Sequence, residues 1–511
     1  MSFRRWFLTA LAVSSSTLPA ARGEPVQKAG LQLPANASIH RDAVQQLFVT
    51  SYEAYQKYAW GHDDLMPESL SYVDARNGWG ASIADAMSTL WIMGFTDWFE
   101  QAVNHTATVD FSRSQTNDTV SLFETTIRYV AGFISSYELS GEKYPILVQK
   151  AQEIADHMVY SWVGNNSVPY GYINFTDNAP TVTTSNIAEA GTLTLEWNLL
   201  SKYTGNDTYR QLAEKSVLYM ANMPGDPLPG MPAQTIDPTT GLTEGGYVTW
   251  SGGSDSYFEY LIKYPRLTNT DDNIYADTWL TAVDSSIRTL LRNSTVGDHL
   301  YLADYDGDEM IRHVGSHLAC FYGGNWILGG KMTNNDTIVN YGLQLTDACW
   351  NTYAGTATGI GPETFAYASS DGNYTGGGAP TAAQLQFYDE HGYYITTSDY
   401  ILRPEVLESN FYAWRVSGDT KYLDNAASAI KSFQDYLPTT VAYTGINDVN
   451  NVTSSKIDDM ESFWFAEVLK YLYLTFDDPT HISLDDYVFN TECHPFKAPA
   501  AKSTYGSGPA S

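Results

Sequence analysis

Acidic residues recur along the chain at points where a helix could begin. The clearest example is Arg403-Pro404-Glu405, which is followed by Glu408. Proline suits the first turn of a helix, so Glu405 would lie near the positive end of the helix dipole, with Glu408 on the same face one turn later. Acids stand beside aromatic or small residues in the same way at Glu124, Glu189, Asp255 and Glu461. Carboxylates on several helix starts, with aromatic neighbours, indicate a carbohydrate-processing site.

Hydrolysis of a glycosidic bond is one reaction that such a site could perform, because it needs two carboxyl groups with different roles. A carboxylic acid protonates the leaving oxygen, and a second carboxylate either attacks the sugar or activates a water molecule. Glu124, Asp255 and Glu405 are the candidates. The chain has 58 Asp and Glu residues, so composition alone does not rank them.

The elements that would position these acids are helices, because apolar residues recur with a period close to 3.6. Helices are predicted over residues 40–58, 82–93, 120–137, 145–159, 187–203, 207–223, 255–264, 274–291, 318–328, 336–353, 406–417, 421–436 and 462–473. Short strands or hairpins are predicted between helices at residues 245–250, 299–304 and 393–397.

The spacing of the acid-bearing helices predicts a repeated helical hairpin. These helices recur roughly every 40–65 residues, and about 440 residues at about 60 per hairpin give about seven hairpins. A closed ring of hairpins would bring the starts of the inner helices to one mouth. An open helical solenoid has the same local pattern, but acidic and aromatic inner helices favour the closed ring. The predicted fold class is therefore all-α.

One large domain, residues 39–497, is predicted between two terminal segments. Residues 1–21 have the pattern of a signal peptide, with Arg4-Arg5, a short apolar run and a small-residue cleavage site. An uncleaved anchor is disfavoured because the apolar run is short, and no later run is long enough to span a bilayer. Residues 22–38 are predicted to be an exposed lead-in, and residues 498–511 a disordered tail.

Charge and sequons indicate the environment of the protein. The chain has 28 Lys and Arg against 58 Asp and Glu, a net charge of −30, which argues against nucleic acid or an anionic membrane as a partner. The same charge suits a cation site and an acidic medium. Ten Asn-x-Ser/Thr sequons favour passage through the secretory pathway, and we expect a secreted monomer. They begin at Asn36, Asn104, Asn117, Asn165, Asn174, Asn206, Asn293, Asn335, Asn373 and Asn451.

The three cysteines predict one disulfide in a secreted protein. Cys320 and Cys349 fall within one putative helical hairpin, so they are the better pair, and Cys493 would remain a free thiol.

The acidic motifs resemble those of glycoside hydrolase family 47, the class I α-1,2-mannosidases, and most of all its secreted fungal members. The resemblance extends from about Val44 to Phe496. It is carried, in the order of the family, by Asp85-Ala86-Met87, Phe123-Glu124-Thr125-Thr126, Ala188-Glu189-Ala190-Gly191-Thr192, Asp255-Ser256-Tyr257-Phe258, His317-Leu318-Ala319-Cys320, Gly361-Pro362-Glu363, Arg403-Pro404-Glu405 and Asn490-Thr491-Glu492.

The resemblance implies an (α/α)7 barrel with short β-hairpins and an inverting, Ca²⁺-dependent exo-α-1,2-mannosidase that acts on high-mannose oligosaccharides. It implies that Glu124 is the general acid and Glu405 the general base, with Asp255 as a third essential carboxylate. The assignment of the base between Glu405 and Asp255 stays open. Thr491 would hold Ca²⁺ through its carbonyl and hydroxyl oxygens.

Other roles also follow from the resemblance. Carboxylates around the metal would hold its water molecules, and Phe463 would form an apolar platform under the sugar, while Arg128 and Arg403 would orient carboxylates and substrate. These carboxylates are Glu189, Glu363, Glu408, Glu467 and Glu492. Without the family, His317 is more simply explained as a structural histidine, and it stays only a possible site residue.

One position suggests how far the substrate would be trimmed. Family members that remove a single mannose carry arginine where this chain has Gly253, and glycine would leave room for several removals, down to a five-mannose core. Two other functions remain. A lectin-like quality-control protein on the same barrel is disfavoured by the intact Glu124, Asp255 and Glu405. An inverting glucan hydrolase on a six-hairpin barrel is disfavoured by Thr491 and by the number of hairpins.

Overall fold

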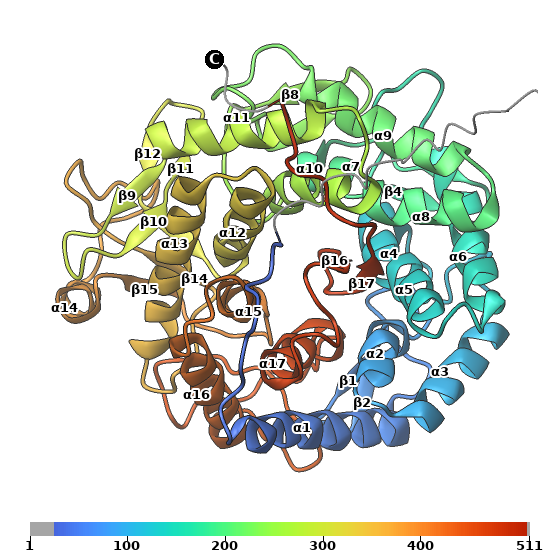
Figure 1. The fold of residues 1–511 in the computed structure, drawn as a ribbon, viewed down its shortest axis with the longest axis horizontal. Coiled ribbons are helices and arrows are strands. Elements are labelled where there is room, and N and C mark those ends of the chain that lie inside the picture. The colour runs from blue at the N-terminus through green and yellow to red at the C-terminus, as the bar shows by residue number, and fades with distance from the viewer. Residues whose placement is uncertain (1–24, 508–511) are drawn as a thin grey trace, which may run out of the picture.

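The computed structural model describes residues 25–507 and consists mainly of helices in two concentric rings (Figure 1). The inner helices are α2 (Ala81–Ile92), α5 (Ala131–Leu139), α8 (Thr194–Thr204), α10 (Asp255–Thr268), α12 (Tyr322–Met332), α15 (Glu405–Ser417) and α17 (Leu469–Phe476). Each contacts the next, and the turn η4 (Trp464–Val468) before α17 contacts α2, which closes the ring.

The outer ring is formed by the helices that alternate with these in the chain. They are α1 (Ala37–Tyr58), α3 (Thr96–Thr108), α6 (Pro145–Met158), α9 (Thr208–Ala221), α11 (Ile274–Thr289), α13 (Asp336–Ala354) and α16 (Lys421–Tyr436). Each outer helix packs on an inner neighbour, from α1 on α17 to α16 on α15. Within residues 25–507, seven helices form each ring, so the (α/α)7 barrel is confirmed and the open solenoid is wrong.

Burial explains which helices are inside. In α15 every residue from Glu405 to Arg415 is buried, as expected for a helix with neighbours on all sides. In the outer helix α16 only one face is buried, and it carries Leu423, Ala426, Ile430 and Phe433. A helix with one buried face thus belongs to the outer ring, and a helix that is buried on all sides belongs to the inner ring.

Short antiparallel strands lie in the connections that lead from an outer helix to the next inner helix. The paired strands are β1 (Asp64–Met66) with β2 (Ser71–Val73), β3 (Val120–Ser121) with β4 (Tyr172–Asn174) and β5 (Ala179–Pro180), β6 (Ser185–Asn186) with β7 (Thr235–Asp237) and β8 (Leu242–Glu244), β9 (Leu291–Asn293) with β10 (Leu300–Leu302), β11 (Asp304–Tyr305) with β12 (Ile311–Arg312), and β13 (Val314–Ser316) with β14 (Thr364–Ala366) and β15 (Tyr394–Thr397). These connections surround the end of the barrel at which the inner helices begin.

One further hairpin lies inside the ring. Strands β16 (Tyr487–Phe489) and β17 (Pro495–Lys497) pair in the centre of Figure 1 and contact α10 and α5 respectively. Their connecting turn, residues 490–494, is almost entirely buried within the barrel. The hairpin therefore carries residues from near the end of the chain into the middle of the ring.

Most predicted elements are confirmed to within a few residues, and the differences have local causes. Helix α3 and the peripheral helix α14 (Ala382–His391) were not predicted from the sequence. The only buried residue of α14 is Tyr388, so this helix has little apolar pattern. The strand predicted at 245–250 is wrong, because β8 ends at Glu244 and Val248 forms only an isolated bridge to Tyr305.

Both predicted terminal segments differ from the structure where it describes them. The lead-in is not fully exposed, because Val26 and Gln27 are buried and the Val26 amide donates to Asp485 at 2.7 Å. Tyr505 in the tail is also buried, and its hydroxyl donates to Asn269 at 2.7 Å, so the prediction of disorder is wrong for residues 498–507. The predicted signal peptide lies outside the described residues.

The predicted disulfide is confirmed. Cys320, in the short turn η3 (Leu318–Phe321), is bonded to Cys349 of α13, while Cys493 is free and buried. None of the helices over residues 25–507 has the length and apolar character needed to cross a membrane.

Candidate active site

A cavity of ≈ 280 Å³ lies where the inner helices begin. Eleven of the residues predicted for the site line it: Glu124, Arg128, Glu189, Gly253, Asp255, Arg403, Glu405, Phe463, Glu467, Thr491 and Glu492. Glu363 and Glu408 are not part of this lining. A larger hollow, of ≈ 680 Å³, surrounds Glu138 and Tyr203, but it contains none of the predicted catalytic residues. The chemistry of the lining, rather than cavity size, therefore identifies the site.

Helix caps place the acids at the mouth. The Glu124 amide donates to Ser121 Oγ at 3.2 Å, and the Glu189 amide donates to Asn186 Oδ1 at 2.8 Å, so each glutamate lies in the first turn of a capped helix. Asp255 is the first residue of α10 and Glu405 the first residue of α15. The inner helices run in the same direction, which explains why their first turns meet.

Two π-helical turns also carry site residues. The turn η1 (Thr126–Val130) contains Arg128, and η4 contains Glu467. Such turns are rare and often mark functional sites, because the additional residue re-aims the side chains around it. Periodicity predicted ordinary helices in both places, so the sequence held no signal for them.

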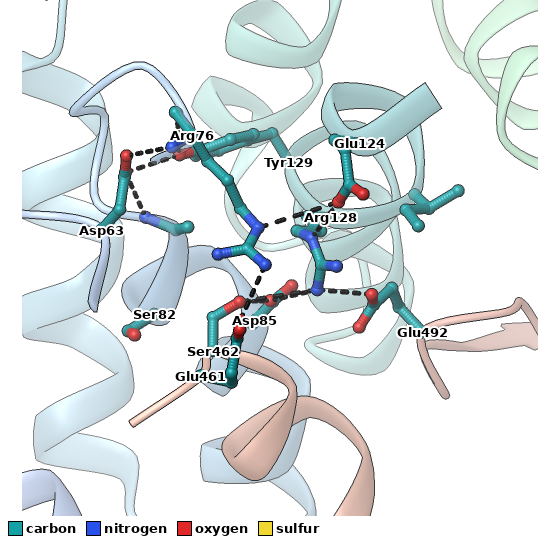
Figure 2. Close-up of polar contacts among 12 residues, drawn as sticks. Asp63, Arg76, Ser82, Asp85, Glu124, Arg128, Tyr129, Glu461, Ser462 and Glu492 are labelled. Carbon is teal, nitrogen blue, oxygen red and sulfur yellow. Dashed lines mark hydrogen bonds and ion pairs between the residues drawn. The ribbon is translucent and has the colours of Figure 1, made fainter. Parts of the chain in front are cut away.

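Arg128 joins three carboxylates, of which Glu124 and Glu492 line the cavity together with it (Figure 2). Its Nε donates to Glu124 at 2.8 Å, and Nη1 lies 3.3 Å from Asp85 Oδ2 and forms an ion pair with Glu492. Burial opposes ionisation of Glu124, but Arg128 and then Arg76 hold the pKa of this carboxyl below its usual value. The Glu124 side chain is 38% exposed, so solvent screens part of this effect.

Glu405 is held by a buried histidine. His317 Nδ1 lies 2.6 Å from Glu405 Oε2, and His317 Nε2 lies 2.7 Å from the Tyr353 hydroxyl. Burial opposes ionisation here too, but the His317 hydrogen bond and the nearby Arg403 keep the pKa of Glu405 below its usual value. Arg403 in turn donates to Glu363 at 2.6 Å. His317, left as a possible site residue by the sequence, thus contacts a candidate catalytic carboxylate.

Asp255 has the opposite electrostatic environment. Burial, together with the negative charges of Glu259 and Glu405, raises its pKa to about 7, against the effect of a hydrogen bond from the Ser256 amide. Burial and neighbouring carboxylates likewise raise the pKa of Glu408 and Glu467. Asp255, Glu408 and Glu467 therefore lie where nearby cations do not offset the negative charge that the carboxylates would carry when ionised.

Thr491 lies at the tip of the β16–β17 hairpin. The side chain of its neighbour Asn490 fixes the tip by donating to Ile127 O at 3.0 Å and to Glu196 at 2.9 Å. Beside it, Glu492 Oε2 is buried without a hydrogen-bond partner. Oxygen donors in an uncompensated acidic environment fit a hard cation such as Ca²⁺. Among the described residues, no three His, Cys, Asp or Glu side chains meet as metal ligands, so an ion here would depend on the Thr491 oxygens and water.

The space at Gly253 is smaller than the sequence suggested. Gly253 has φ +86°, and a Cβ at this position would lie 2.8 Å from Gln234 Nε2. The Gln234 amide donates to Gly252 O at 2.6 Å, so this side chain occupies the room next to the glycine. Gly253 lines the cavity, but a larger residue there would have to displace Gln234.

Arg76 is a further residue of the site that was not predicted from the sequence. This residue lies between β2 and α2, where no periodic pattern marks it, and its guanidinium reaches Glu124 at 3.7 Å. Only the folded ring brings the two together.

A closed ring of seven helix pairs with carboxylates gathered at the starts of its inner helices defines a carbohydrate-active (α/α)7 barrel. The chain belongs to glycosyl hydrolase family 47, whose model matches residues 47–498. It is 39% identical over 514 residues to a probable mannosyl-oligosaccharide alpha-1,2-mannosidase 1B of Aspergillus clavatus, covering 96% of this chain and 97% of that one.

Two further relatives agree. A mannosyl-oligosaccharide alpha-1,2-mannosidase of Coccidioides posadasii is 40% identical, covering 89% of this chain and 90% of that one. The solved alpha-1,2-mannosidase from Trichoderma reesei superposes with a TM-score of 0.87 at 36% identity, covering 90% of this chain and 99% of that chain. The family and the fold expected from the motifs are therefore confirmed.

Proposed function

We propose that this glycoside hydrolase is an exo-acting α-1,2-mannosidase that trims high-mannose N-glycans with inversion of the anomeric centre and depends on Ca²⁺. The observation that carries the proposal is the gathering of Glu124, Asp255 and Glu405 around one cavity that also reaches Thr491. Its ≈ 280 Å³ is near the lower end of the range of about 300–1,000 Å³ for small-molecule sites, which suits a terminal sugar and thus exo action.

The proposed inverting reaction assigns different roles to Glu405 and Glu124. Glu405, with its lowered pKa, is ionised and acts as the general base that takes a proton from the attacking water. Glu124 protonates the leaving oxygen. Its two arginines favour the carboxylate in the free protein, so bound sugar, by excluding water, must raise its pKa before it can donate. Asp255, with a pKa of about 7, is the third essential carboxylate and the rival for either proton role.

Ca²⁺ would be held by the carbonyl and hydroxyl oxygens of Thr491, with its water molecules oriented by the surrounding carboxylates. These are Glu189, Glu363, Glu408, Glu467 and Glu492. When bound, the ion supplies positive charge that orders sugar hydroxyls and water. Phe463 provides an apolar surface for the sugar, although the Arg128 guanidinium lies 5.6 Å from the centre of its ring. Arg403 keeps Glu363 in place.

We further propose that the protein acts as a monomer in the secretory pathway and is secreted. The support is the signal-peptide pattern together with the sequons, whose ten asparagines are all exposed. Gly253 supports trimming of several mannoses, because it carries no side chain that could fix one glycan branch.

Incubation of the purified protein with a high-mannose glycan tests the proposal. We expect release of mannose, its loss with a chelator and its recovery with Ca²⁺. NMR should show the β-anomer first, because attack by water on the face opposite the leaving group inverts the centre. An early α-anomer would contradict inversion. The lectin-like alternative predicts binding of the glycan without any released mannose.

A further inference from the structure

Arg76 lies where the ring closes, at the contact between the first and last parts of the chain, which we call the seam. The first and last parts of the chain meet here, since the Met460 amide donates to Leu65 O at 2.9 Å. Arg76 spans this seam: Nη1 donates to Asp64 at 2.8 Å on the β1 side, and Nη2 donates to Glu461 at 2.8 Å on the α17 side. Its two terminal nitrogens thus hold both edges of the seam, which fixes the plane of the guanidinium.

The main chain of Arg76 is fixed as well. Its amide donates to Asp63 Oδ2 at 2.7 Å, and its carbonyl accepts from the Tyr129 hydroxyl at 2.9 Å. The buried Asp63 also accepts from the amides of Gly80 and Ala81 at the start of α2. Arg76 therefore has little freedom to move: its side chain is 14% exposed, and both its backbone and its guanidinium are held.

The remaining donor of Arg76 faces the proposed general acid. Nε is buried without a hydrogen-bond partner and lies 3.7 Å from Glu124 Oε2, the same oxygen that accepts from Arg128 Nε at 2.8 Å. Figure 2 shows both guanidinium groups directed at the Glu124 carboxylate. Of the acids paired with these arginines, Glu124 alone contacts both, because Arg76 otherwise holds Asp64 and Glu461, and Arg128 holds Asp85 and Glu492.

We propose that Arg76 is a positioning residue for Glu124, which it holds from the seam of the ring as the second guanidinium beside Arg128. This inference rests on the proposed function, since it assigns Arg76 a role through the residue that serves the leaving oxygen. Arg76 is absent from the cavity lining, so it acts through Glu124 rather than on the sugar.

Arg76→Gln tests this assignment through turnover and pH dependence. We expect kcat to fall about 10²-fold, the scale of a misplaced catalytic group, with KM within about twofold. Removal of a positive charge raises the pKa of a nearby carboxyl, so the limb of the pH–rate profile that belongs to Glu124 should move to higher pH. The other charged or titratable groups that face Glu124 are Arg128, Asp85, Glu189, Glu492 and Tyr172, and they are unchanged in this variant.

Two further variants make the result decisive. Arg76→Lys keeps the positive charge but loses the planar guanidinium with its three nitrogens. Compared with Arg76→Gln, it should therefore recover part of kcat and most of the wild-type pH profile. Arg266→Gln is the control, because Arg266 is even more deeply buried than Arg76 but donates to the carbonyls of Pro499 and Asp485 and lies away from the cavity. It should lower the melting temperature without moving the profile.

Each outcome has one meaning. A raised KM with unchanged kcat, or a profile in Arg76→Gln that matches Arg266→Gln, would overturn the inference. If Arg76→Gln does not fold, Arg76→Lys serves alone: it should still lower kcat, because lysine has no Nε donor that faces Glu124, and an unchanged kcat would equally overturn the inference. Failure of the wild-type protein to release mannose in the same assay would instead refute the proposed function.

Discussion

At the scale of single residues, the carboxylates of the site differ because their neighbours differ. Glu405 is buried and Glu124 is partly exposed, and both lie beside cationic or hydrogen-donating groups that lower their pKa values, whereas burial and the negative charges of Glu259 and Glu405 raise the pKa of Asp255 to about 7. Three acids with the same chemistry thus gain different protonation states, which is what acid–base catalysis requires.

Glu124→Gln should remove most activity and leave the fold intact. The amide keeps the shape of the side chain but cannot donate the proton, and loss of a general acid costs about 10²–10⁴-fold in turnover. Turnover on the natural glycan is the measurement, with the exposed Glu142→Gln as the control. Activity close to that of the wild type would reject Glu124 as the acid and favour Asp255.

Stability in the absence of Ca²⁺ should fall as the pH rises from about 4 towards 7. Asp255 has a folded pKa of about 7 against an ordinary 3.8, so in this range the folded state binds more protons than the unfolded state, and stability decreases with pH. Glu408 and Glu467 act in the same direction. Ca²⁺ would compensate these charges, so it should stabilise the protein more at about pH 7 than at about pH 5.

Melting temperatures with a chelator and with Ca²⁺ at both pH values check this expectation. Asp255→Asn should flatten the dependence in the chelated protein, because the amide does not titrate. A chelated wild-type protein that is more stable at about pH 7 than the same protein at about pH 5 would count against it.

At the scale of elements, helix caps and periodicity explain where most helices begin and end, but not how two of them deform. The π-helical turns η1 and η4 have sequences that suit ordinary helices, and each supplies a residue to the lining of the same cavity. Their extra residue is stabilised by contacts such as that of Arg128 with Glu492, which come from another part of the chain.

The disulfide is the element-scale feature that is simplest to test. It ties η3 to α13 across a sequence separation of 29 residues, so its removal in Cys320→Ala/Cys349→Ala should lower the free energy of unfolding by about 2–4 kcal/mol. Denaturation with and without a reducing agent gives the measurement. The double variant should not respond to the reducing agent, and peptide mapping that finds Cys493 in a bridge would contradict the pairing.

At the scale of the whole molecule, the arrangement of the ring limits which part of a substrate can reach the cavity. The β16–β17 hairpin lies inside the barrel, while the connections with strands surround the mouth at which the inner helices begin (Figure 1). The cavity of ≈ 280 Å³ at this mouth is consistent with the proposed action on the end of an oligosaccharide.

Trimming of a high-mannose glycan should proceed through several α-1,2-linked mannoses and stop at a five-mannose product. The reason is Gly253, which presents no side chain that could select one branch. Mass spectrometry of the glycan over time is the direct measurement, and accumulation of a resistant eight-mannose product would point to single-bond specificity. Gly253→Arg should narrow the products, but φ +86° and the nearby Gln234 make it a strained variant, so the wild-type time course is the cleaner test.

The sequence by itself determined most of the helices, the repeated hairpin, the disulfide and most carboxylates of the site, because caps, periodicity and acidic motifs are local. The structure decided what depends on distant contacts. Arg76 and Glu461 are 385 residues apart in the chain, and His317 reaches Glu405 across 88, so no local pattern could join either pair. The same holds for Gln234 beside Gly253 and for the buried Val26 and Tyr505, since burial depends on which surfaces the closed ring brings together.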